Sequence, residues 1–492
     1  MTIGDSLQSL AIQQPHKPAI CYNGQTIDYA TFSQKVRQYE QKLLSQFVTN
    51  QQRTIAILCG NEPAFLELCF AIVRLGWIVL PLDPKWTEKE QHDALKSAHP
   101  DLCIVSDEEK FNTAYLENYL LLKDLETTQP ISDEKHIKVE STTLFYYGFT
   151  SGSSGLPKGF VRNHRSWEES FPDISSAFSY EPDDVVIAPG PLCYSLSLFS
   201  ALHALHSGYT FILFDSFKAD SLLDYIQKHQ KTIIYVVPTM LYQIIEAHTE
   251  PIFSEVTFIS AGAKLEDSIK QICKAAFPNA RLFEYYGASE LSIVAYQEIT
   301  NHSTYHNIKP FPGVQLSIRN QTGEKCKANE IGQIYVNSNY IFTAYPNHHV
   351  ETQNVLTTYG ATVGDIGYLD DSGNLTVMGR HSNMIISGGL NIYPEEIEQT
   401  IKTIDAIKEV VVIGCDDMYW GQKVIAFIQW GTDHQNCTNL IKTHCQKHLA
   451  KHKVPKSFIT VTKFPYTNNG KVDRKLLQER LRDETHANTC YC

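Results

Sequence analysis

The first part of the chain alternates short apolar runs with longer segments in which apolar residues recur every three or four positions. A short apolar run bounded by polar residues is typical of a buried strand, and the longer period is typical of an amphipathic helix. The pattern predicts strands over Thr54–Leu58, Trp77–Leu82 and Leu102–Ser106, with helices over Pro63–Leu75 and Thr87–Ala98 between them. This order predicts a parallel sheet with helices on its faces.

The same alternation returns later in the chain and then changes character. The strands predicted there are 185–188, 211–214, 233–237 and 257–260, and the helices are 196–207, 219–229 and 239–247. From Val314 to Val377 the pattern becomes one of short alternating strands and turns, which favours a small β-barrel or sheet. Past Arg380 a compact α+β pattern follows, with helices over Pro394–Thr403 and Cys437–Leu449.

The stretch Phe149–Gly159, FTSGSSGLPKG, carries the first candidate chemistry. Its glycines let the backbone approach a ligand closely, and successive N–H groups with hydroxyls and Lys158 form an anion site. A flexible surface linker is the alternative, since Gly/Ser-rich segments often are linkers. The apolar run Leu144–Tyr147 reads as a strand feeding the loop, which favours a phosphate-binding loop.

Composition narrows the class of protein without identifying a ligand. A chain of 492 residues is expected to form two or more domains. The formal net charge of −12 argues against a nucleic-acid partner. The 12 cysteines include no CxxC pair, so we expect reduced thiols in a cytosol. The start of the chain lacks a signal-peptide pattern, and no apolar run reaches membrane-spanning length.

Three further segments place charged residues in turns. Glu284–Glu290 carries an acidic residue at each end of an aromatic–glycine turn, Thr362–Asp365 places a carboxylate after a glycine, and Pro465–Arg474 presents Lys471. Each motif alone is weak, because such turns are common. Their order and spacing after the loop at Phe149–Gly159 are specific.

Together these motifs make the sequence resemble the adenylate-forming superfamily of acyl- and aryl-CoA ligases, peptide-synthetase adenylation domains and luciferases. The similarity runs through nearly the whole chain, and Ile385–Pro394 is most similar to the acid–CoA ligase branch. The resemblance implies an α/β fold. A large N-terminal domain of parallel sheets, flanking helices and a small β-barrel spans 1–379, a hinge spans 380–382, and a small mobile α+β lid spans 383–492.

The resemblance also implies the chemistry. A carboxylic acid attacks the α-phosphate of ATP to give acyl-AMP and pyrophosphate, and a thiol, here that of coenzyme A, then takes the acyl group. Such transfers depend chiefly on positioning and charge stabilisation. Glu290 matches the Mg²⁺ ligand, as a hard cation prefers carboxylate oxygen. Lys471, on the lid, is expected to bridge the carboxylate and the α-phosphate.

The remaining nucleotide positions follow from the same match. Lys158 and the loop around it would hold the β- and γ-phosphates, Tyr286 would lie against adenine, and Asp365 with Arg380 would bind the ribose. The paired glycines of the lid would line the tunnel for the pantetheine arm. The matching residues are Thr150, Ser151, Gly152, Ser153, Ser154, Gly155, Lys158, Gly262, Ala263, Glu284, Tyr285, Tyr286, Gly287, Ser289, Asp365, Arg380, Gly388 and Gly389.

Tyr194, Leu198, Gly262 and Gly287 match positions that contact the acid. Tyr194 stands where a histidine or phenylalanine commonly gates the acid site, and Glu284 stands where an asparagine often meets adenine. Amino-acid-activating relatives carry an aspartate shortly after the gate, but the stretch 193–202 has no carboxylate. A buried ammonium without a partner would be costly, so we predict a fatty or aromatic acid without an α-amino group.

Two alternatives stay open at this point. The chain could load a carrier-protein phosphopantetheine thiol in place of coenzyme A, or it could be a non-catalytic binding protein that kept the fold. The retention of Lys158, Glu290, Asp365 and Lys471 argues against the second alternative. We expect a cytoplasmic enzyme, with peripheral membrane contact only if the acid is long-chain.

Overall fold

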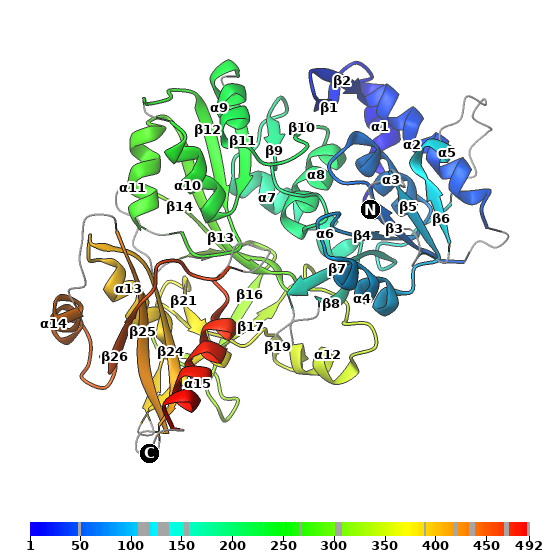
Figure 1. Ribbon diagram of the computed structural model, residues 1–492. Coiled ribbons are helices and arrows are strands. Elements are labelled where there is room, and N and C mark those ends of the chain that lie inside the picture. Colours follow the sequence, from blue (N-terminus) through cyan, green and yellow to red (C-terminus); the bar gives the residue numbers. More distant parts are fainter. Residues whose placement is uncertain are drawn as a thin grey trace. The chain divides into compact units, whose positions relative to one another are not determined.

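The computed structural model describes residues 1–47, 51–106, 116, 118–125, 137–151, 157–229, 231–248, 250–265, 267–300, 308–387, 390–417, 421–431, 438–466 and 472–489. Contacts within the chain divide it into two compact units (Figure 1). The first contains Met1–Leu316 and Val336–Val363, and the second contains Ser317–Tyr335 and Gly364–Cys492.

A large mixed sheet forms one part of the first unit. In the described residues its nine strands run in the order β15-β14-β13-β12-β11-β9-β10-β1-β2. Their bounds are β1 Pro18–Tyr22, β2 Gln25–Asp28, β9 Val185–Ile187, β10 Thr210–Leu213, β11 Lys231–Val236, β12 Glu255–Ser260, β13 Arg281–Ala288, β14 Ser292–Glu298 and β15 Lys309–Pro310. The strands from β10 through β13 pair in parallel, as the sequence predicts.

Helices cover this sheet because their apolar stripes match the strand residues facing them. Helices α9 (Ala219–Lys228), α10 (Pro238–Glu246) and α11 (Asp267–Ala276) lie beside strands β11 and β12 (Figure 1). Leu222, Ile244 and Cys273 from these helices share one buried cluster with residues of the strands. Burial of such side chains contributes roughly 1.5–3 kcal/mol for each large aliphatic residue.

The sheet also takes up a hairpin from the start of the chain, which the sequence pattern does not predict. Strand β1 pairs in parallel with β10, so that Ile20 faces Phe211 in register. Helices α1 (Ser6–Gln13) and α2 (Tyr29–Leu44) flank this hairpin in sequence. A pairing between residues so far apart depends on tertiary contacts and leaves no local signature.

The second sheet of the first unit carries the phosphate-loop candidate. Its order in the described residues is β6-β5-β3-β4-β7-β8. The bounds are β3 Thr54–Leu58, β4 Ile78–Pro81, β5 Leu102–Val105, β6 Tyr119–Leu121, β7 Leu144–Ser151 and β8 Pro157–Asn163, with helices α3 Pro63–Arg74, α4 Glu88–Ala98 and α5 Leu122–Leu125. The predicted helix at Thr87 begins one residue later, because Thr87 forms a capping box with Glu90.

Strands β7 and β8 form an antiparallel hairpin, with Thr150 opposite Lys158 in register. The sequence predicts the first strand of this hairpin but treats Lys158 as part of the loop. In the structure Lys158 lies on β8, so its backbone is fixed by strand pairing.

The rest of the first unit contributes helices and short strands. They are α6 Arg165–Glu168, α7 Phe171–Ala177, α8 Ser195–Ser207, α12 His349–Val355, β18 Leu356–Thr357 and β19 Gly360–Ala361. Strand β17 (Gly332–Asn337) is shared in sequence by the two units, and its residue Val336 pairs with Ala361.

The second unit contains two groups of described strands. Strand β20 (Asp365–Leu369) pairs antiparallel with β21 (Leu375–Arg380). Beyond them, the order β23-β22-β25-β24 is joined by β26, which pairs with β25. The remaining bounds are β16 Gln315–Arg319, η2 His381–Asn383, β22 Ile385–Ser387, β23 Leu390–Ile392, α13 Pro394–Lys402, β24 Ile407–Asp417, β25 Gly421–Trp430, α14 Thr438–His448, β26 Ser457–Thr460 and α15 Arg474–Thr489.

Strand β24 is apolar on both sides because helices cover both faces of this sheet. Val410 and Val412 pack in a cluster with residues of α13 and α14, whereas Val411 and Ile413 pack with Leu477 of α15. Side chains of a strand alternate between faces, so a sheet buried on both sides requires a continuous apolar run. This confirms the predicted α+β pattern past Arg380.

Three buried histidines lie in the first unit near α8. His203 is fully buried and stacks on the Phe171 ring. Its Nε2 shares a hydrogen bond of 2.9 Å with Ser175 Oγ. His164 and His206 are also buried. Burial lowers the pKa of His203 to about 3 and those of His164 and His206 to about 4.

These histidines predict an acid-sensitive fold. Their folded pKa values lie below the ordinary value of about 6.5, so the unfolded chain binds more protons. Their contribution is complete above pH 6.5 and is lost as the pH falls from about 6.5 toward 4, by up to about 1.4 kcal/mol per pH unit for each histidine. Urea denaturation at several pH values should show a shallower acid loss for His203→Gln than for the wild type.

His16→Gln is the matched control, because the His16 side chain is 93% exposed. This variant should follow the wild-type pH dependence. Parallel curves for His203→Gln and the wild type would contradict the assignment.

Candidate active site

Lys158 lies at the end of the β7–β8 hairpin, on a tyrosine ring. Its Nζ lies 3.5 Å from the centroid of the Tyr345 ring. Burial lowers the pKa of Lys158 below its usual value, and the nearby carboxylates of Glu351 and Glu290 act in the opposite direction. The ammonium therefore occupies a partly desolvated position with negative groups around it.

Glu290 follows strand β13 and contacts the same tyrosine. The Tyr345 hydroxyl donates a hydrogen bond to Glu290 Oε1 at 2.5 Å, and the Phe342 N–H donates to the Glu290 carbonyl at 2.8 Å. Tyr345 is only 6% exposed, so this short bond lies in a largely dry environment. Tyr345 thus contacts both Lys158 and Glu290, two residues predicted to act on the phosphates and the metal.

Arg162, on β8, is buried and connects two other segments of the same region by hydrogen bonds. Its Nη1 donates to the Tyr340 carbonyl at 2.7 Å, and its Nη2 donates to the Ser289 carbonyl at 2.8 Å. The residue is 2% exposed, and burial lowers its pKa to about 10. Glu290 provides a nearby negative charge that counteracts this effect.

Glu284 is buried in the middle of β13, opposite the last residue of β12, and it fixes the loop after β12. Its Oε1 accepts the Leu265 N–H at 2.7 Å, and its Oε2 accepts from Gln297 Nε2 at 3.0 Å. Lys270 Nζ lies 3.7 Å from Oε2. Because Leu265 follows Gly262 and Ala263, Glu284 holds that predicted adenine-binding loop against the strand.

The segment from Tyr285 to Ser289 runs out of β13 into a tight hairpin. A Cβ on Gly287 would lie 2.2 Å from the Ser292 carbonyl oxygen, so only glycine allows the strands to approach this closely. Tyr285 faces the aromatic cluster around Phe178, with ring centroids 6.4 Å apart, and burial raises the pKa of its hydroxyl. Tyr286, which alternates with Tyr285 along the strand, points to the other face.

Asp365 and Arg380 face each other across β20 and β21 in the second unit. Arg380 Nε donates to Asp365 Oδ1 at 3.1 Å. Asp365 is buried, whereas the Arg380 side chain is 54% exposed. The predicted ribose-binding pair is therefore assembled within one strand pairing.

Tyr194, the predicted gate, caps the start of α8 and bonds to a carboxylate that the sequence reading did not consider. Its hydroxyl donates to Asp83 Oδ2 at 2.8 Å, while Asp83 Oδ1 accepts the Lys85 N–H at 2.9 Å. Burial raises the pKa of the Tyr194 hydroxyl, and the neighbouring Cys193 and Asp83 add to this. Leu198, one turn into α8, is buried.

Family models match both parts of the chain. The model described as AMP-binding enzyme matches residues 7–346, and the model described as AMP-binding enzyme C-terminal domain matches residues 396–471. The first match alone covers more than half of the chain.

The chain belongs to the AMP-binding enzyme family. Among its relatives is an uncharacterized acyl–CoA ligase of Bacillus subtilis (strain 168), which is 32% identical over 98% of this chain and 99% of the relative. A putative long chain fatty acid–CoA ligase of Staphylococcus haemolyticus is 29% identical, over 96% of each chain.

Two solved structures show the same fold. ATP-bound MatB from Rhodopseudomonas palustris aligns with a TM-score of 0.89 at 23% identity, covering 98% of this chain and 99% of that one. The o-succinylbenzoate CoA synthetase of Bacillus subtilis, in complex with an acyl-adenylate, aligns with a TM-score of 0.86, over 97% and 98% of the two chains.

These matches confirm several of the predictions. The fold class is α/β with a separate C-terminal domain, and the chain is an adenylate-forming enzyme of the AMP-forming acid–CoA ligase class. The o-succinylbenzoate CoA synthetase of Bacillus subtilis has also been solved in complex with ATP and a magnesium ion. In the part of the chain that the structure describes, no helix is both long and apolar enough to cross a bilayer. The matches do not test the roles of individual residues, which stay predictions.

Several predicted site residues fall outside the described residues. They are Gly152, Ser153, Ser154, Gly155, Gly388, Gly389 and Lys471. Ser151 ends strand β7, and its side chain is not described. The elements on either side of these residues are in place: β7 and β8 flank the first group, and β22 and β23 flank the paired glycines.

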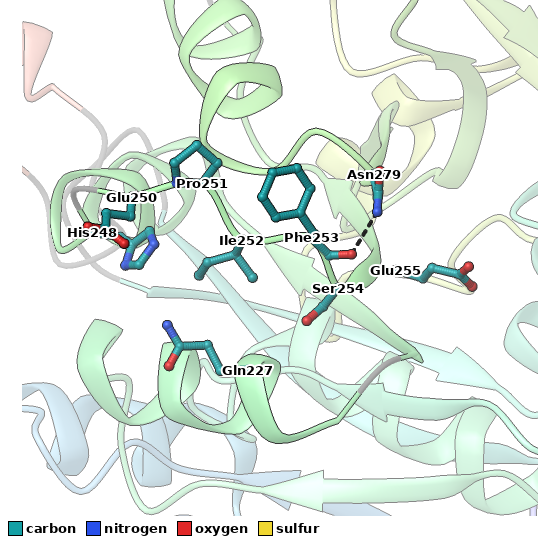
Figure 2. Close-up of a pocket in the computed structure, with 9 residues that line it drawn as sticks. All are labelled: Gln227, His248, Glu250, Pro251, Ile252, Phe253, Ser254, Glu255 and Asn279. Atoms are coloured by element: carbon teal, nitrogen blue, oxygen red, sulfur yellow. Dashed lines mark hydrogen bonds between the residues drawn. The ribbon is translucent and has the colours of Figure 1, made fainter.

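A surface cavity of about 500 Å³ lies elsewhere on the large sheet (Figure 2). Its lining includes Glu255, at the amino end of β12, and Asn279, whose side chain donates to the Phe253 carbonyl at 2.7 Å. Ligands of α/β sheets bind at the carboxyl ends of the strands. Since none of the predicted site residues lines this cavity, it is not part of the candidate active site.

Sequence reasoning missed Arg162, Tyr345 and Asp83. Arg162 directly follows the apolar residues Phe160 and Val161, and this could have indicated its role. A charged residue in a buried strand requires a specific hydrogen-bond partner. Tyr345 lies directly before Pro346, in a stretch whose sequence carries no comparable signal.

Arg162 predicts a large stability effect from a conservative change. Arg162→Lys retains the charge but loses the planar fork that reaches both carbonyls, leaving at least one buried carbonyl without its donor. We expect the free energy of unfolding, measured by urea denaturation, to fall by about 2 to 4 kcal/mol.

Arg281→Lys is the matched control, since Arg281 pairs with Glu298 on the surface, where the side chains are 42% and 39% exposed. Its effect should stay below about 1 kcal/mol. A loss for Arg162→Lys no larger than that of the control would contradict the bridging role.

Proposed function

We propose that this enzyme activates a fatty or aromatic carboxylic acid without an α-amino group, and transfers it from acyl-AMP to coenzyme A. The observation that carries the proposal is the placement of Lys158 and Glu290 on one buried tyrosine, next to the hairpin of the phosphate-loop candidate. A cation and a carboxylate at this place are what a polyphosphate with its metal requires.

Glu290 fits the role of magnesium ligand. Its Oε1 is held by Tyr345, and within the described residues its Oε2 accepts no hydrogen bond. Magnesium in such sites is bound by one or two carboxylates together with substrate phosphates, and it neutralises charge that develops on them. Glu290 would supply Oε2, and Lys158 would place its ammonium beside the β- and γ-phosphates.

The residues around the nucleotide would position it for in-line attack. An oxygen of the acid attacks the α-phosphorus, the bond from that phosphorus to the β-phosphate bridging oxygen breaks, and pyrophosphate leaves. Lys471 would stabilise the charge on both reacting groups. Thr150, Asp365 and Arg380 would hold the phosphates and the ribose, while Glu284 retains lone pairs that suit the adenine amino group.

The second half-reaction would use the lid. The sulfur of coenzyme A attacks the acyl carbonyl, the carbon–oxygen bond to AMP breaks, and the thiol proton passes to solvent. We propose a domain of 1–379, a hinge at 380–382 and a lid of 383–492 that turns between the half-reactions. Gly388 and Gly389 would then line the path of the pantetheine arm, where glycine allows close approach.

The choice of acid rests on the residues near the gate. Helix α8 offers Leu198 and Phe199, and Asp83, the carboxylate that reaches Tyr194, already accepts the Tyr194 hydroxyl and the Lys85 N–H. A substrate ammonium would therefore compete with these bonds. Relatives include a 2-succinylbenzoate–CoA ligase and putative long chain fatty acid–CoA ligases, which supports an acid without an amino group.

The cytoplasm is the proposed location, because the described cysteines are all free thiols, as expected in a reducing compartment. A carrier-protein thiol is the alternative acceptor, and contact with a membrane surface would accompany only a long-chain acid.

Acid-dependent ATP–pyrophosphate exchange across a panel of fatty, aromatic and amino acids tests the substrate class. We expect exchange with at least one fatty or aromatic acid, a dependence on Mg²⁺, and a thioester when coenzyme A is added. Exchange with amino acids alone would contradict the proposed substrate. Exchange without any coenzyme A thioester would favour the carrier protein as acceptor.

Lys471→Ala tests the proposed division of labour between the half-reactions. We expect this variant to lose at least about 100-fold in adenylation, because the lysine would act only on charge in that transition state. Thioester formation from supplied acyl-adenylate should change by less than about threefold. Lys475→Ala, an exposed lysine on α15, is the control, and equal losses in both half-reactions for Lys471→Ala would contradict its role.

A further inference from the structure

The segment Tyr340–Tyr345 connects the two halves of the candidate phosphate site. On one side, the Val161 N–H donates to the Ala344 carbonyl at 2.9 Å, and the Thr343 N–H donates back to the Val161 carbonyl at 2.8 Å. On the other side, the Phe342 N–H donates to the Glu290 carbonyl. The segment therefore fixes the distance between β8, which carries Lys158, and the turn that carries Glu290.

Tyr345 ends this segment and is itself held firmly. Its N–H donates to Thr352 Oγ1 at 3.0 Å, and the Phe342 ring meets its ring edge-on, with centroids 4.8 Å apart. The side chain is nearly fully buried. A tyrosine with its backbone and ring both restrained can hold its two polar contacts in a fixed geometry.

Those contacts keep two opposite charges apart. The Tyr345 hydroxyl binds Glu290 Oε1, its ring carries the Lys158 ammonium, and within the described residues Lys158 and Glu290 form no direct ion pair. A direct pair would neutralise both groups before a ligand arrived. An aromatic face attracts a cation without removing its charge, and a hydroxyl occupies only one carboxylate oxygen.

We propose that Tyr345 is a positioning residue for the magnesium–triphosphate site, which holds Glu290 and Lys158 apart so that each remains available to the ligand. The inference rests on the proposed roles of Glu290 and Lys158. The inference adds Tyr345 to these two residues. The Tyr345 hydroxyl orients Glu290, the proposed metal ligand, and the Tyr345 ring orients Lys158, the proposed phosphate-binding lysine. Residues that orient a metal ligand typically change metal affinity or activity by 10–100-fold when removed.

Two substitutions separate the hydroxyl from the ring. Tyr345→Phe retains the ring under Lys158 and loses the bond to Glu290, so we expect the Mg²⁺ concentration for half-maximal exchange to rise by about tenfold or more. The rate at saturating Mg²⁺ should fall by less than about threefold. Tyr345→Leu also loses the aromatic face, and its KM for ATP should rise by a further threefold to tenfold, approximately.

Tyr29→Phe is the matched control. Tyr29 is fully buried, and its hydroxyl donates to the Tyr209 carbonyl at 2.6 Å, far in sequence from the candidate site. Loss of this hydroxyl should lower stability without changing the Mg²⁺ requirement. If the Mg²⁺ concentration for half-maximal exchange rose equally in Tyr29→Phe and Tyr345→Phe, the rise would come from a general loss of stability. That result would overturn the inference.

A crystal structure of ligand-free Tyr345→Leu provides a readout that does not depend on activity. We expect the Lys158 ammonium and the Glu290 carboxylate to move within about 4 Å of each other, the range of a direct ion pair. If both groups keep their wild-type positions, Tyr345 does not separate them and the inference is wrong. Absence of exchange with every acid in the wild type would instead contradict the proposed function, while the crystal structure would still decide what Tyr345 does.

Discussion

The geometry of the candidate site in the first unit depends on the hydrogen bonds of the buried Arg162 guanidinium. It donates to the carbonyls of Tyr340 and Ser289, which belong to segments far apart in the chain. Burying a charge is costly unless it is hydrogen-bonded, and the planar fork of arginine satisfies two acceptors with little loss of freedom. Lys158 lies four residues before Arg162 on the same strand, and Glu290 follows Ser289. Together with the segment Tyr340–Tyr345, this buried group therefore sets the spacing between the residues that we expect to meet the phosphates and the metal.

In the second unit, a largely buried arginine also fixes one element to another. Arg474 begins helix α15, donates to the Val412 carbonyl at 2.8 Å, and binds both oxygens of Glu398 at 2.6 and 2.7 Å. The pair is largely buried, and its attraction offsets the desolvation that raises the pKa of Glu398. The helix that follows Lys471 by three residues is thus fixed to the sheet at its first residue.

The sequence predicted the parts of this protein that depend on local patterns. The strand before the phosphate-loop candidate, the α/β alternation and the α+β pattern past Arg380 follow from the spacing of apolar residues, and the helix predicted over Thr87–Ala98 begins within one residue of its predicted start. Arg162, Tyr345 and Asp83 were missed because their roles come from partners at least 55 residues away in the chain. Glu284 was assigned to adenine alone, although the structure also gives it a loop to hold, through Leu265 and Gln297. Individual ligand contacts stay predictions, since spacing identifies a motif but not the second partner of each side chain.

The pairing of β1 with β10 has a consequence for biosynthesis. Ile20 and Phe211 are neighbours in the sheet but are separated by about 190 residues of chain. A ribosome adds roughly 5–20 residues per second, so the N-terminal hairpin emerges about 10–40 seconds before the strand that completes it. During that interval the edge of β1 that pairs with β10 has no native partner, and an unpaired strand edge is a site at which chaperones that act on nascent chains can bind.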